Sequence, residues 1–399
     1  MSTSAAKVIL FPGKEKSIQR FHQWIFSGAI DKIEGTATEG DVVQVYSATD
    51  QFLALGHIQT GAIAVRILSF EPVDIDQSFW AERLSQAFEL RKETVLKQQN
   101  ETNSFRLVHG EGDRLPGLVI DIYNQTAVFQ AHSVGMFVSR KTIADALLKI
   151  DELALDAVYD KSSHTLNLGD FPDAEEDYLV EGTHSSSETT IRENGNEFFV
   201  NFLEGQKTGF FLDQRENRNL LGQFSENRTV LNLFAYSGGF SVYALKHGAT
   251  HVDSVDSSET AIAMCNRNVE LNFGMSASHA GICEDGFQFL KQDLRKYDLV
   301  ILDPPAFAKH PKSVKNAHIG YKRLNQQAMK GMKSGSFLFT FSCSQAFSKD
   351  DFQKSLYSAA RNAHRQIRII SQLGQPADHP VDIFHPESNY LKGFVLQVI

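Results

Sequence analysis

A cysteine and an aspartate in the last third of the chain have the chemistry needed to act on a nucleobase. Cys343 follows the apolar segment 336–341, and Asp303 follows the segment 298–302, so each residue ends a predicted strand. A cysteine thiolate can add to C6 of a cytosine and turn the ring into an enamine whose C5 accepts a methyl group. Asp303 can hydrogen-bond to N3 of the same base, or protonate it, while the thiolate adds. The two residues therefore predict methylation of a cytosine at C5.

The residues after Asp303 restrict the backbone at the end of that strand. Pro304 lacks an N–H group and confines Asp303 to extended backbone angles, and Pro305 prolongs the rigid turn. An Asp-Pro-Pro turn at this place in a sheet, with an aromatic residue close behind it, points to methylation of a planar amine or a base. Phe307 supplies the aromatic ring, which we expect to stack on the base. The alternative is an ordinary strand-terminating turn.

A second group of residues predicts a site for an adenosine cofactor. The strand 229–234 runs into a loop with paired glycines at 238 and 239, which let the backbone turn tightly and approach a ligand closely. Asp256 ends the next strand, roughly 20 residues on, the interval at which a carboxylate meets a ribose hydroxyl; a helix N-cap is the alternative. Asp285, after the following strand, is expected to accept a hydrogen bond from an adenine amino group. Because the chain lacks Gly-x-Gly-x-x-Gly at this loop, a dinucleotide is disfavoured. The predicted cofactor-binding residues of this region are Phe234, Tyr236, Ser237, Gly238, Asp256 and Asp285.

Charge is distributed unevenly along the chain. The net charge of −9 counts against nucleic-acid binding if it is taken as a single number. Residues 304–348 nevertheless contain no Asp or Glu, and they follow the Asp-Pro-Pro motif. A solvated charged face is the alternative interpretation, but such faces usually mix both signs, so we interpret the window as an RNA contact. Its basic residues are Lys309, Lys312, Lys315, Lys322, Arg323, Lys330 and Lys333.

The remaining cysteines and the N-terminus give weaker signals. Cys265 and Cys283 are interpreted as inert packing residues, the first on an apolar helix face and the second at the end of a core strand. Three cysteines, an odd number, argue against a disulfide framework, and their spacing excludes a Cys-x-x-Cys zinc site. The first ten residues carry no secretion signal, so we expect a cytoplasmic protein.

The pattern of predicted elements divides the chain into three domains, 1–73, 74–185 and 186–399. The first consists of short strands at 7–11, 40–46, 52–58 and 62–68 and is expected to form a small β-barrel-like module. The second combines helices at 78–100 and 138–150 with strands at 105–109, 118–123, 126–131 and 157–159, which we expect to form an antiparallel sheet. The third alternates strands at 229–234, 252–256, 279–283, 298–303 and 337–342 with helices, which predicts an α/β fold with a parallel sheet covered on both faces.

With these motifs in place, the chain resembles the bacterial PUA-domain cytosine-5 methyltransferases that act on large-subunit rRNA. The resemblance covers nearly the whole chain, and its carriers are the segments 22–28, 112–117, 205–215, 232–239, 303–307 and 341–344. It implies a PUA domain, a central α+β domain, and a Rossmann-like class I methyltransferase domain that uses S-adenosylmethionine. It also implies Cys343 as nucleophile and 23S rRNA as substrate. We expect no metal in the site, and no membrane partner because no apolar run is long enough to span a bilayer.

The resemblance extends the set of expected site residues. Gln214 and Arg215 join the cofactor site. Substrate contacts are expected from Lys207, Phe210, Pro304, Pro305, Phe307, Lys309, Lys322 and Arg323. Two positions depart from the pattern: Gln23 stands where the family often has proline, and Ala306 stands where broader RNA cytosine-5 methyltransferases often have a second cysteine that assists product release.

Two other functions stay open at this point. The first is an N-methyltransferase acting on an exocyclic amine of RNA, which would not need Cys343. The second is a non-catalytic RNA-binding protein on a methyltransferase fold. The target nucleotide, the choice between free rRNA and an assembling particle, the base that removes the C5 proton, and the oligomeric state, including a homodimer, also stay open.

Overall fold

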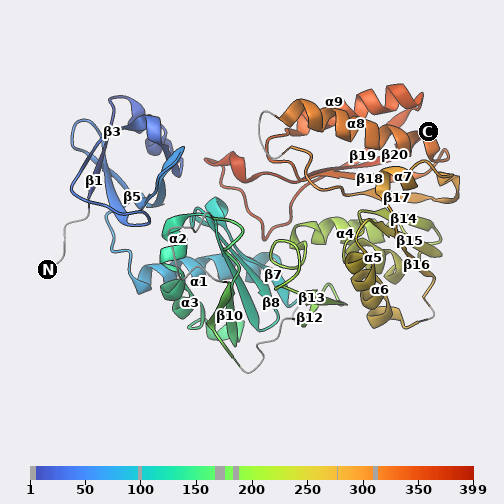
Figure 1. Cartoon of the computed structure of the whole chain (residues 1–399), viewed down its shortest axis with the longest axis horizontal. Helices are drawn as coiled ribbons and strands as arrows, with labels where there is room; N and C mark the ends of the chain where they lie inside the picture. Colours follow the sequence, from blue (N-terminus) through green and yellow to red (C-terminus); the bar gives the residue numbers. More distant parts are fainter. Residues whose placement is uncertain (1–5, 98–100, 167–175, 183–187, 276, 309–312) are drawn as a thin grey trace. The chain divides into compact units, whose positions relative to one another are not determined.

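The computed structural model describes all residues except 1–5, 98–100, 167–175, 183–187, 276 and 309–312, so Lys309 and Lys312 lie outside the described residues. Two compact units make up the chain (Figure 1). Unit 1 comprises Met1–Thr189, Val200–Phe210 and Ala377–Ser388, and unit 2 comprises Thr190–Phe199, Phe211–Pro376 and Asn389–Ile399. No helix in the described part of the chain is both long and apolar enough to cross a membrane.

Unit 1 begins with a six-stranded sheet of order β2-β6-β5-β4-β1-β3. Its strands are β1 (Lys7–Leu10), β2 (Trp24–Phe26), β3 (Ile30–Glu34), β4 (Val42–Tyr46), β5 (Phe52–Ile58) and β6 (Ile63–Ser69). Every second side chain of β1 and β4 is buried, as expected for strands with one face on a core. All four strands predicted in this region are present, whereas the short β2 and the largely exposed β3 were not predicted.

The second sheet of unit 1 is mixed, with order β11-β10-β9-β8-β7. Its elements are α1 (Gln77–Thr94), β7 (Ser104–His109), β8 (Leu118–Tyr123), β9 (Thr126–Ala131), α2 (Val134–Val138), α3 (Arg140–Leu147), β10 (Ala157–Asp160) and β11 (Asp177–Val180). The predicted antiparallel sheet is wrong at one pair: β9 and β10 run parallel, because the helices between them carry the chain back to the start of the sheet. The helix predicted at 138–150 is α3, and a second, shorter helix, α2, precedes it and ends at Val138.

A hairpin of β12 (Glu188–Glu193) and β13 (Asn196–Asn201) follows, and the boundary between the two units crosses it. Asn194 and Gly195 form its turn with φ of 49° and 71°, the left-handed angles that a two-residue hairpin turn requires. The Asn-Gly pair was a sequence signal for this hairpin, which was not predicted.

Unit 2 contains a seven-stranded sheet of order β16-β15-β14-β17-β18-β20-β19. Its strands are β14 (Thr229–Leu233), β15 (His251–Asp256), β16 (His279–Cys283), β17 (Leu299–Leu302), β18 (Phe337–Ser342), β19 (Ile367–Leu373) and β20 (Lys392–Val398). Its helices are α4 (Arg215–Gly222), α5 (Gly239–Lys246), α6 (Glu259–Phe273), α7 (Gly286–Phe289), α8 (Val314–Gly331) and α9 (Lys349–Ala363). The strands from β16 to β18 in this order run parallel, and β20 runs antiparallel between β18 and β19.

Both faces of this sheet are buried under helices, which confirms the predicted arrangement. Leu231, Val300 and Leu338 pack with residues of α8 and α9, whereas their neighbours Val230, Leu299 and Phe339 pack with residues of α4 and α5. Alternate side chains of a strand point to opposite faces, so two apolar clusters require strands that are apolar throughout.

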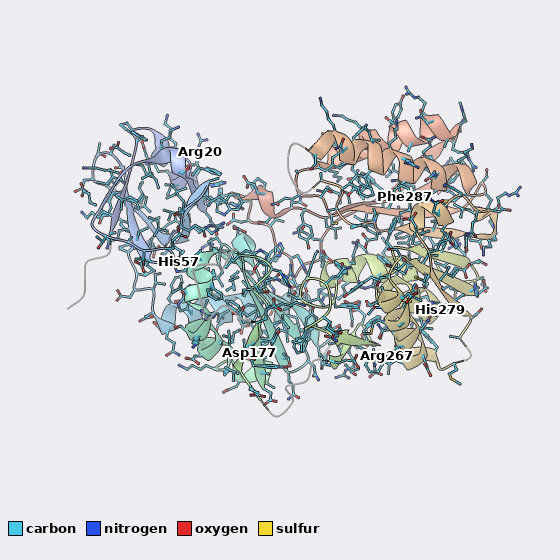
Figure 2. All side chains as sticks on the ribbon, in the orientation of Figure 1. Arg20, His57, Asp177, Arg267, His279 and Phe287 are labelled. Carbon is cyan, nitrogen blue, oxygen red and sulfur yellow. The ribbon has the colours of Figure 1, made fainter. Side chains whose placement is uncertain are left out.

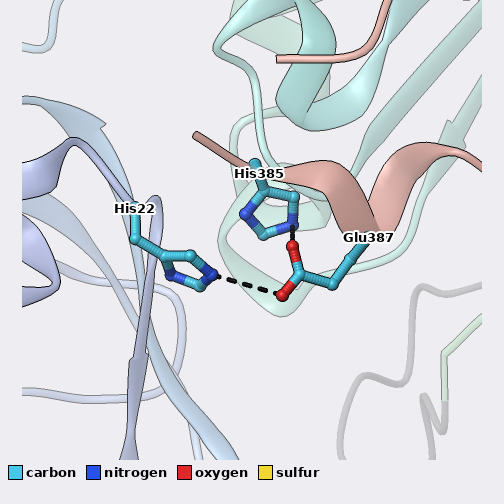
Figure 3. Close-up of side chains that lie close together, drawn as sticks. All are labelled: His22, His385 and Glu387. Atoms are coloured by element: carbon cyan, nitrogen blue, oxygen red, sulfur yellow. Dashed lines mark hydrogen bonds and ion pairs between the residues drawn. The ribbon is translucent and has the colours of Figure 1, made fainter. Parts of the chain in front are cut away.

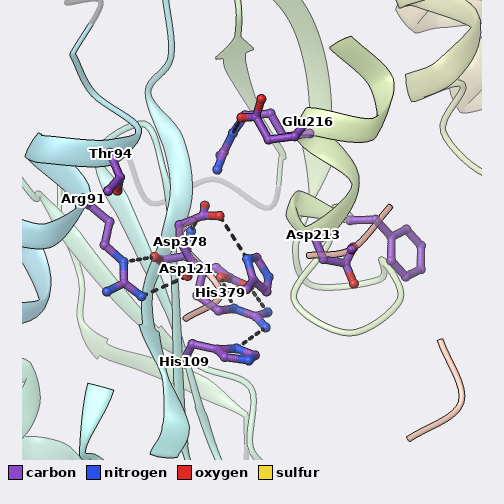
Figure 4. A network of polar contacts seen from close by, with 12 residues as sticks. Arg91, Thr94, His109, Asp121, Asp213, Glu216, Asp378 and His379 are labelled. Atoms are coloured by element: carbon purple, nitrogen blue, oxygen red, sulfur yellow. Dashed lines mark hydrogen bonds and ion pairs between the residues drawn. The ribbon is translucent and has the colours of Figure 1, made fainter. Parts of the chain in front are cut away.

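A segment near the C-terminus belongs to unit 1 rather than to unit 2. The backbone carbonyl of Asp378 accepts a hydrogen bond of 2.9 Å from Arg91 of α1, and its carboxylate accepts one of 3.1 Å from the amide of Arg106 in β7 (Figure 4). Arg91 is fully buried and also donates to both oxygens of Asp113, at 2.7 Å to Oδ2. The segment 377–388 therefore depends on a buried ion pair for its attachment. The expected boundaries at 73 and 185 stay a prediction.

We expect Arg91→Met to destabilise unit 1 by about 3–5 kcal/mol, because it leaves the Asp113 carboxylate buried without its ion-pair partner. Both tryptophans of the chain, Trp24 and Trp80, lie in unit 1, so tryptophan fluorescence during urea unfolding measures this unit. The neighbouring Lys92, whose partners Glu89 and Glu152 are exposed, is the matched control, and Lys92→Met should have little effect on stability. Equal effects of the two substitutions would contradict the assignment.

Candidate active site

The carboxyl ends of the parallel strands in unit 2 define the candidate site. From β14 the chain continues to β15 on one side of the sheet, and later returns through β17 to β18 on the other side. Ligands of such sheets bind at this switch in strand order, outside the carboxyl ends. The loop after β14, Asp256 after β15, Asp303 after β17 and Cys343 after β18 all lie at that edge.

The loop between β14 and α5 has a backbone conformation that few residues tolerate. Phe234, Tyr236 and Gly238 all have positive φ, of 63°, 46° and 80°. A Cβ atom on Gly238 would lie 2.5 Å from the Cys265 sulfur of α6, so the loop lies directly against that helix. The ring of Tyr236 packs edge-to-face on Phe211, with 5.1 Å between centroids. A backbone held in this way can follow the surface of a ligand closely.

Asp256 holds this loop and keeps capacity for a ligand. Its Oδ2 accepts a hydrogen bond of 3.0 Å from the amide of Tyr236, and its Oδ1 accepts one of 3.0 Å from the amide of Ser258. The N-cap of α6 is Ser258, whose hydroxyl accepts from the amide of Ala261, so the N-cap alternative for Asp256 does not apply. Each carboxylate oxygen has two lone pairs, so one on each oxygen stays available to a ribose hydroxyl.

Asp285 is the N-cap of α7. Its carboxylate accepts a hydrogen bond of 2.9 Å from the amide of Gln288, and the residue is exposed. Its second oxygen is the atom that fits the predicted role toward an adenine amino group.

A chain of buried polar side chains supports the loop from below. The Asn232 amide donates to the Ser241 hydroxyl at 2.9 Å, and Ser241 contacts Ser254 at 2.7 Å. Ser254 in turn contacts His279, which is labelled in Figure 2, at 2.8 Å. Burial lowers the pKa of His279 to about 4, so the ring is neutral and carries a single N–H group. Such a network fixes the position of the loop, because breaking any one of these hydrogen bonds would leave a buried polar group without a partner.

The two other cysteines differ from each other. Burial raises the pKa of Cys265 to about 11, which keeps its thiol protonated and agrees with a packing role. The packing interpretation of Cys283 is wrong, because its side chain is exposed at the end of the edge strand β16.

Gln214 connects the segment before α4 to Asp303. Its amide donates a hydrogen bond of 2.9 Å to Oδ2 of Asp303, and its oxygen accepts one of 2.6 Å from Asn217. Gln214 and Arg215 are both buried, and the guanidinium of Arg215 lies 3.5 Å from the Glu216 carboxylate. The structure thus brings Gln214 to the predicted acid, and its side chain orients the carboxylate of Asp303.

Cys343 lies beside the Asp-Pro-Pro turn. Its sulfur is 3.9 Å from the carbonyl oxygen of Pro304, and its side chain is half-buried. Pro304 is buried and Pro305 is exposed. The turn and the thiol therefore lie next to each other at the ends of β17 and β18.

Lys392 is a charged residue of this site that the sequence reasoning missed. It pairs with Ser342 at the start of β20, and its buried ammonium donates to the carbonyl oxygens of Ser344 at 2.6 Å and Phe347 at 2.7 Å. Burial lowers its pKa to about 8, and the charge of Cys343 acts in the opposite direction. The sequence signal that could have revealed Lys392 is a lysine at the first position of a mostly apolar strand.

The predicted substrate residues of unit 2 fall into two groups. Phe307 is partly buried, with its ring 4.7 Å from that of Tyr321 and 6.4 Å from that of Phe287, so it belongs to an aromatic cluster. Lys322 and the exposed Arg323 lie on α8, where Arg323 covers the Phe287 ring at 5.7 Å. A pocket of about 480 Å³ adjoins them and is lined by Phe287, Asn316, Ile319, Gly320 and Arg323.

Two predicted substrate residues belong to unit 1. Lys207 is exposed and has a φ of 52°, whereas Phe210 is buried. The hydroxyl of Tyr123 accepts from the amide of Phe210 at 3.2 Å, and it also contacts the Thr208 hydroxyl at 3.0 Å. The 205–210 loop is anchored to β8 in this way, and its exposed residues are Gln206 and Lys207.

Comparisons with known proteins agree with this geometry. A model of the S-adenosylmethionine-dependent methyltransferase family matches residues 161–389, and a model of the PUA-like domain matches residues 8–70. The strand order, the loop after β14 and this match define the class of the protein as an S-adenosylmethionine-dependent methyltransferase with an N-terminal PUA-like domain. Ribosomal RNA large subunit methyltransferase I of Pseudoalteromonas atlantica is 38% identical, over 99% of this chain and 100% of that protein. The Escherichia coli protein of the same name is 36% identical over the same shares. The chain belongs to the ribosomal RNA large subunit methyltransferase I family.

Solved structures show the same fold. A methyltransferase-like chain from Streptococcus mutans is 24% identical with a TM-score of 0.82, covering 98% of this chain and 100% of that one. A chain described as a methyltransferase complexed with SAH is 25% identical with a TM-score of 0.84, over the same shares.

Gly238→Ala tests the glycine loop as part of the cofactor site. The added Cβ meets the Cys265 sulfur, so we expect the loop to shift and the dissociation constant for S-adenosylhomocysteine, measured by titration calorimetry, to rise by roughly tenfold or more. Gly335→Ala is the matched control, because Gly335 has a similar φ of 89° but open space around it. It should cost about 1–2 kcal/mol in stability and leave the affinity unchanged. Unchanged affinity in Gly238→Ala would remove the loop from the cofactor site.

Proposed function

We propose that this chain transfers a methyl group from S-adenosylmethionine to C5 of a cytosine in large-subunit rRNA, through a covalent bond between Cys343 and C6. The observation that carries the proposal is the meeting of a half-buried thiol and a carboxylate at adjacent strand ends, next to the loop after β14. The names of the relatives support rRNA as the substrate and hence a cytoplasmic site of action.

Cys343 and Asp303 have different roles in this reaction. The thiolate of Cys343 adds to C6 of the cytosine, and the π electrons move toward N3 and C5. Asp303, oriented by the Gln214 amide, hydrogen-bonds or protonates N3 and offsets the charge that develops there. Bound S-adenosylmethionine supplies an electrophilic methyl group that C5 accepts. A base then removes the C5 proton, the C6–S bond breaks, and Cys343 leaves as a thiolate.

The other residues position the reactants. The backbone of the 234–238 loop, Asp256 and Asp285 would hold the adenosine part of the cofactor, and the buried Arg215 would contribute to the same site. The basic side chains of Lys322 and Arg323 on α8, with the exposed Lys207 of unit 1, would contact RNA phosphates. Ala306 leaves the product-release step without the second cysteine of broader RNA cytosine-5 methyltransferases.

The decisive test identifies the methylated nucleoside. The purified protein is incubated with labelled S-adenosylmethionine and unmodified large-subunit rRNA, and the RNA is digested. We expect label in 5-methylcytidine, and we expect Cys343→Ser to reduce it by about 1,000-fold or more because it removes the nucleophile. Cys283→Ser removes the exposed cysteine at the end of β16 and should keep full activity.

A second readout separates this chemistry from its rivals. RNA containing 5-fluorocytosine should trap the wild-type protein as a stable adduct, because the fluorine at C5 cannot leave as a proton does. Cys343→Ser should give no adduct. Label in an N-methylated base, or undiminished activity of the serine variant, would instead support methylation of an exocyclic amine, and no label at all would support a non-catalytic RNA-binding role.

We further propose that the Lys392 ammonium stabilises the Cys343 thiolate. If so, Lys392→Met removes a nearby positive charge and raises the pH at which the thiol becomes reactive, by about one unit. The measurement is the rate of Cys343 alkylation by iodoacetamide against pH, in a Cys283→Ser background so that the exposed thiol does not contribute. Because the pKa of Lys392 is about 8, the wild type and the variant should converge as the pH rises above that value.

Lys330→Met, an exposed lysine of α8, is the control and should leave the alkylation profile unchanged. If Lys392→Met also leaves it unchanged, Lys392 serves only to hold the 344–347 turn, and the electrostatic role is wrong.

A further inference from the structure

Two histidines and a glutamate from distant parts of the sequence meet in unit 1, whereas the candidate active site belongs to unit 2. His22 precedes β2, whereas His385 and Glu387 lie in the C-terminal segment 377–388 that joins this unit. His22 and Glu387 are 365 positions apart in the sequence, so no spacing motif announces the cluster. One ligand atom from each of the three side chains lies within 4.8 Å of the others (Figure 3).

His385 is the residue that makes this cluster unusual. Its side chain is 0% exposed, and neither ring nitrogen has a hydrogen-bond partner. Its Nε2 faces Oε2 of Glu387 at 3.8 Å, too far for a hydrogen bond (Figure 3). A buried imidazole without partners is costly, so a partner atom at Nε2 would stabilise the fold.

His22 and Glu387 face the same point. The Nε2 of His22 lies 3.5 Å from Oε1 of Glu387, and its other nitrogen contacts the backbone carbonyl of Trp24 at 3.3 Å. With its proton on Nδ1, donated to that carbonyl, His22 would turn a lone pair on Nε2 toward Glu387, the usual arrangement of a metal-binding histidine. The competing contact from the Trp24 amide to Nδ1, at 3.2 Å, would instead place the proton on Nε2.

The charges around the cluster favour a cation. The carboxylates of Glu111, Glu387 and Asp382 all act electrostatically on His385. Glu111 accepts from the Trp24 indole at 2.8 Å, and Asp382 accepts from the Gln23 amide at 3.1 Å, so both are held in place next to the histidines. The Glu387 side chain is 43% exposed, which gives an ion a path from solvent.

We propose that His22, His385 and Glu387 bind a divalent transition-metal ion of the Zn²⁺ class. Two imidazole nitrogens and one carboxylate oxygen are a common ligand set for such ions, with water completing the coordination. Tetrahedral ligands of Zn²⁺ lie about 3.3 Å apart. The two histidine–carboxylate distances, 3.5 Å to Oε1 and 3.8 Å to Oε2, are close to this value, and the three ligand atoms, which lie within 4.8 Å of one another, would move closer together around the ion. The ion would fasten the β2 region to the 377–388 segment. The site goes beyond the methyl transfer proposed above and beyond the expectation of no metal.

The test is a zinc titration of the full-length protein, freed of any affinity tag and first stripped with EDTA. In competition with a chromophoric chelator, we expect one Zn²⁺ per chain at micromolar affinity or tighter. Glu387→Gln and His385→Ala should each weaken binding by roughly tenfold or more, because each removes one of three ligands. Zinc should also raise the melting temperature of the wild type by about 5 °C, and this rise should be lost in Glu387→Gln.

His251→Gln is the matched control, because His251 pairs with Asp253 at 2.8 Å in unit 2 without a third ligand in the described part of the chain; it should leave binding unchanged. Glu387→Gln keeps the shape of a half-exposed side chain, so it tests the site even if His385→Ala fails to fold. Absence of binding in the wild type, or binding that survives both substitutions, would overturn the proposal. Zinc that is lost only in Cys283→Ser would likewise overturn it and would assign the ion to the exposed thiol.

Discussion

Hydrogen bonding between parallel strands is the constraint on which the candidate active site depends. β14 pairs with β15 on one side and with β17 on the other, and β17 pairs with β18, so their carboxyl ends meet at one edge of the sheet. Helices cover both faces, and a slip of one residue in register would move apolar side chains from one cluster to the other. The loop after β14, Asp303 and Cys343 therefore take their relative positions from the sheet.

Buried polar groups then set the orientation of the side chains at that edge. Asp256 fixes the loop through the Tyr236 amide, Gln214 orients Asp303, and Lys392 holds the turn that follows Cys343. Each of these groups makes a hydrogen bond that is at least partly buried, so each orientation is costly to change. Precise geometry of this kind matters for methyl transfer, where alignment of donor and acceptor is a large part of catalysis.

Unit 1 combines the N-terminal part of the chain with a segment from near the C-terminus. The strands β19 and β20 are neighbours in the sheet of unit 2, yet the segment 377–388 between them belongs to unit 1. There, the buried Arg91 binds both Asp113 and the backbone of Asp378, near the start of the segment. His385 and Glu387, near its end, lie close to His22. The chain therefore passes between its two units more than once, which couples the order of the C-terminal segment to the folding of the N-terminal half.

The sequence alone determined the alternation of strands and helices in 229–342, the glycine loop, and the strand-end positions of Asp256, Asp303 and Cys343, because these follow from local periodicity and from turn residues. It did not determine the parallel pairing of β9 with β10, the exposure of Cys283, or the places of β19 and β20, because pairing depends on partners far away in the chain. Lys392 beside Cys343 and the group of His22, His385 and Glu387 also arise only in three dimensions. A residue's type is local information, whereas its burial, its charged neighbours and hence its pKa are properties of the folded chain.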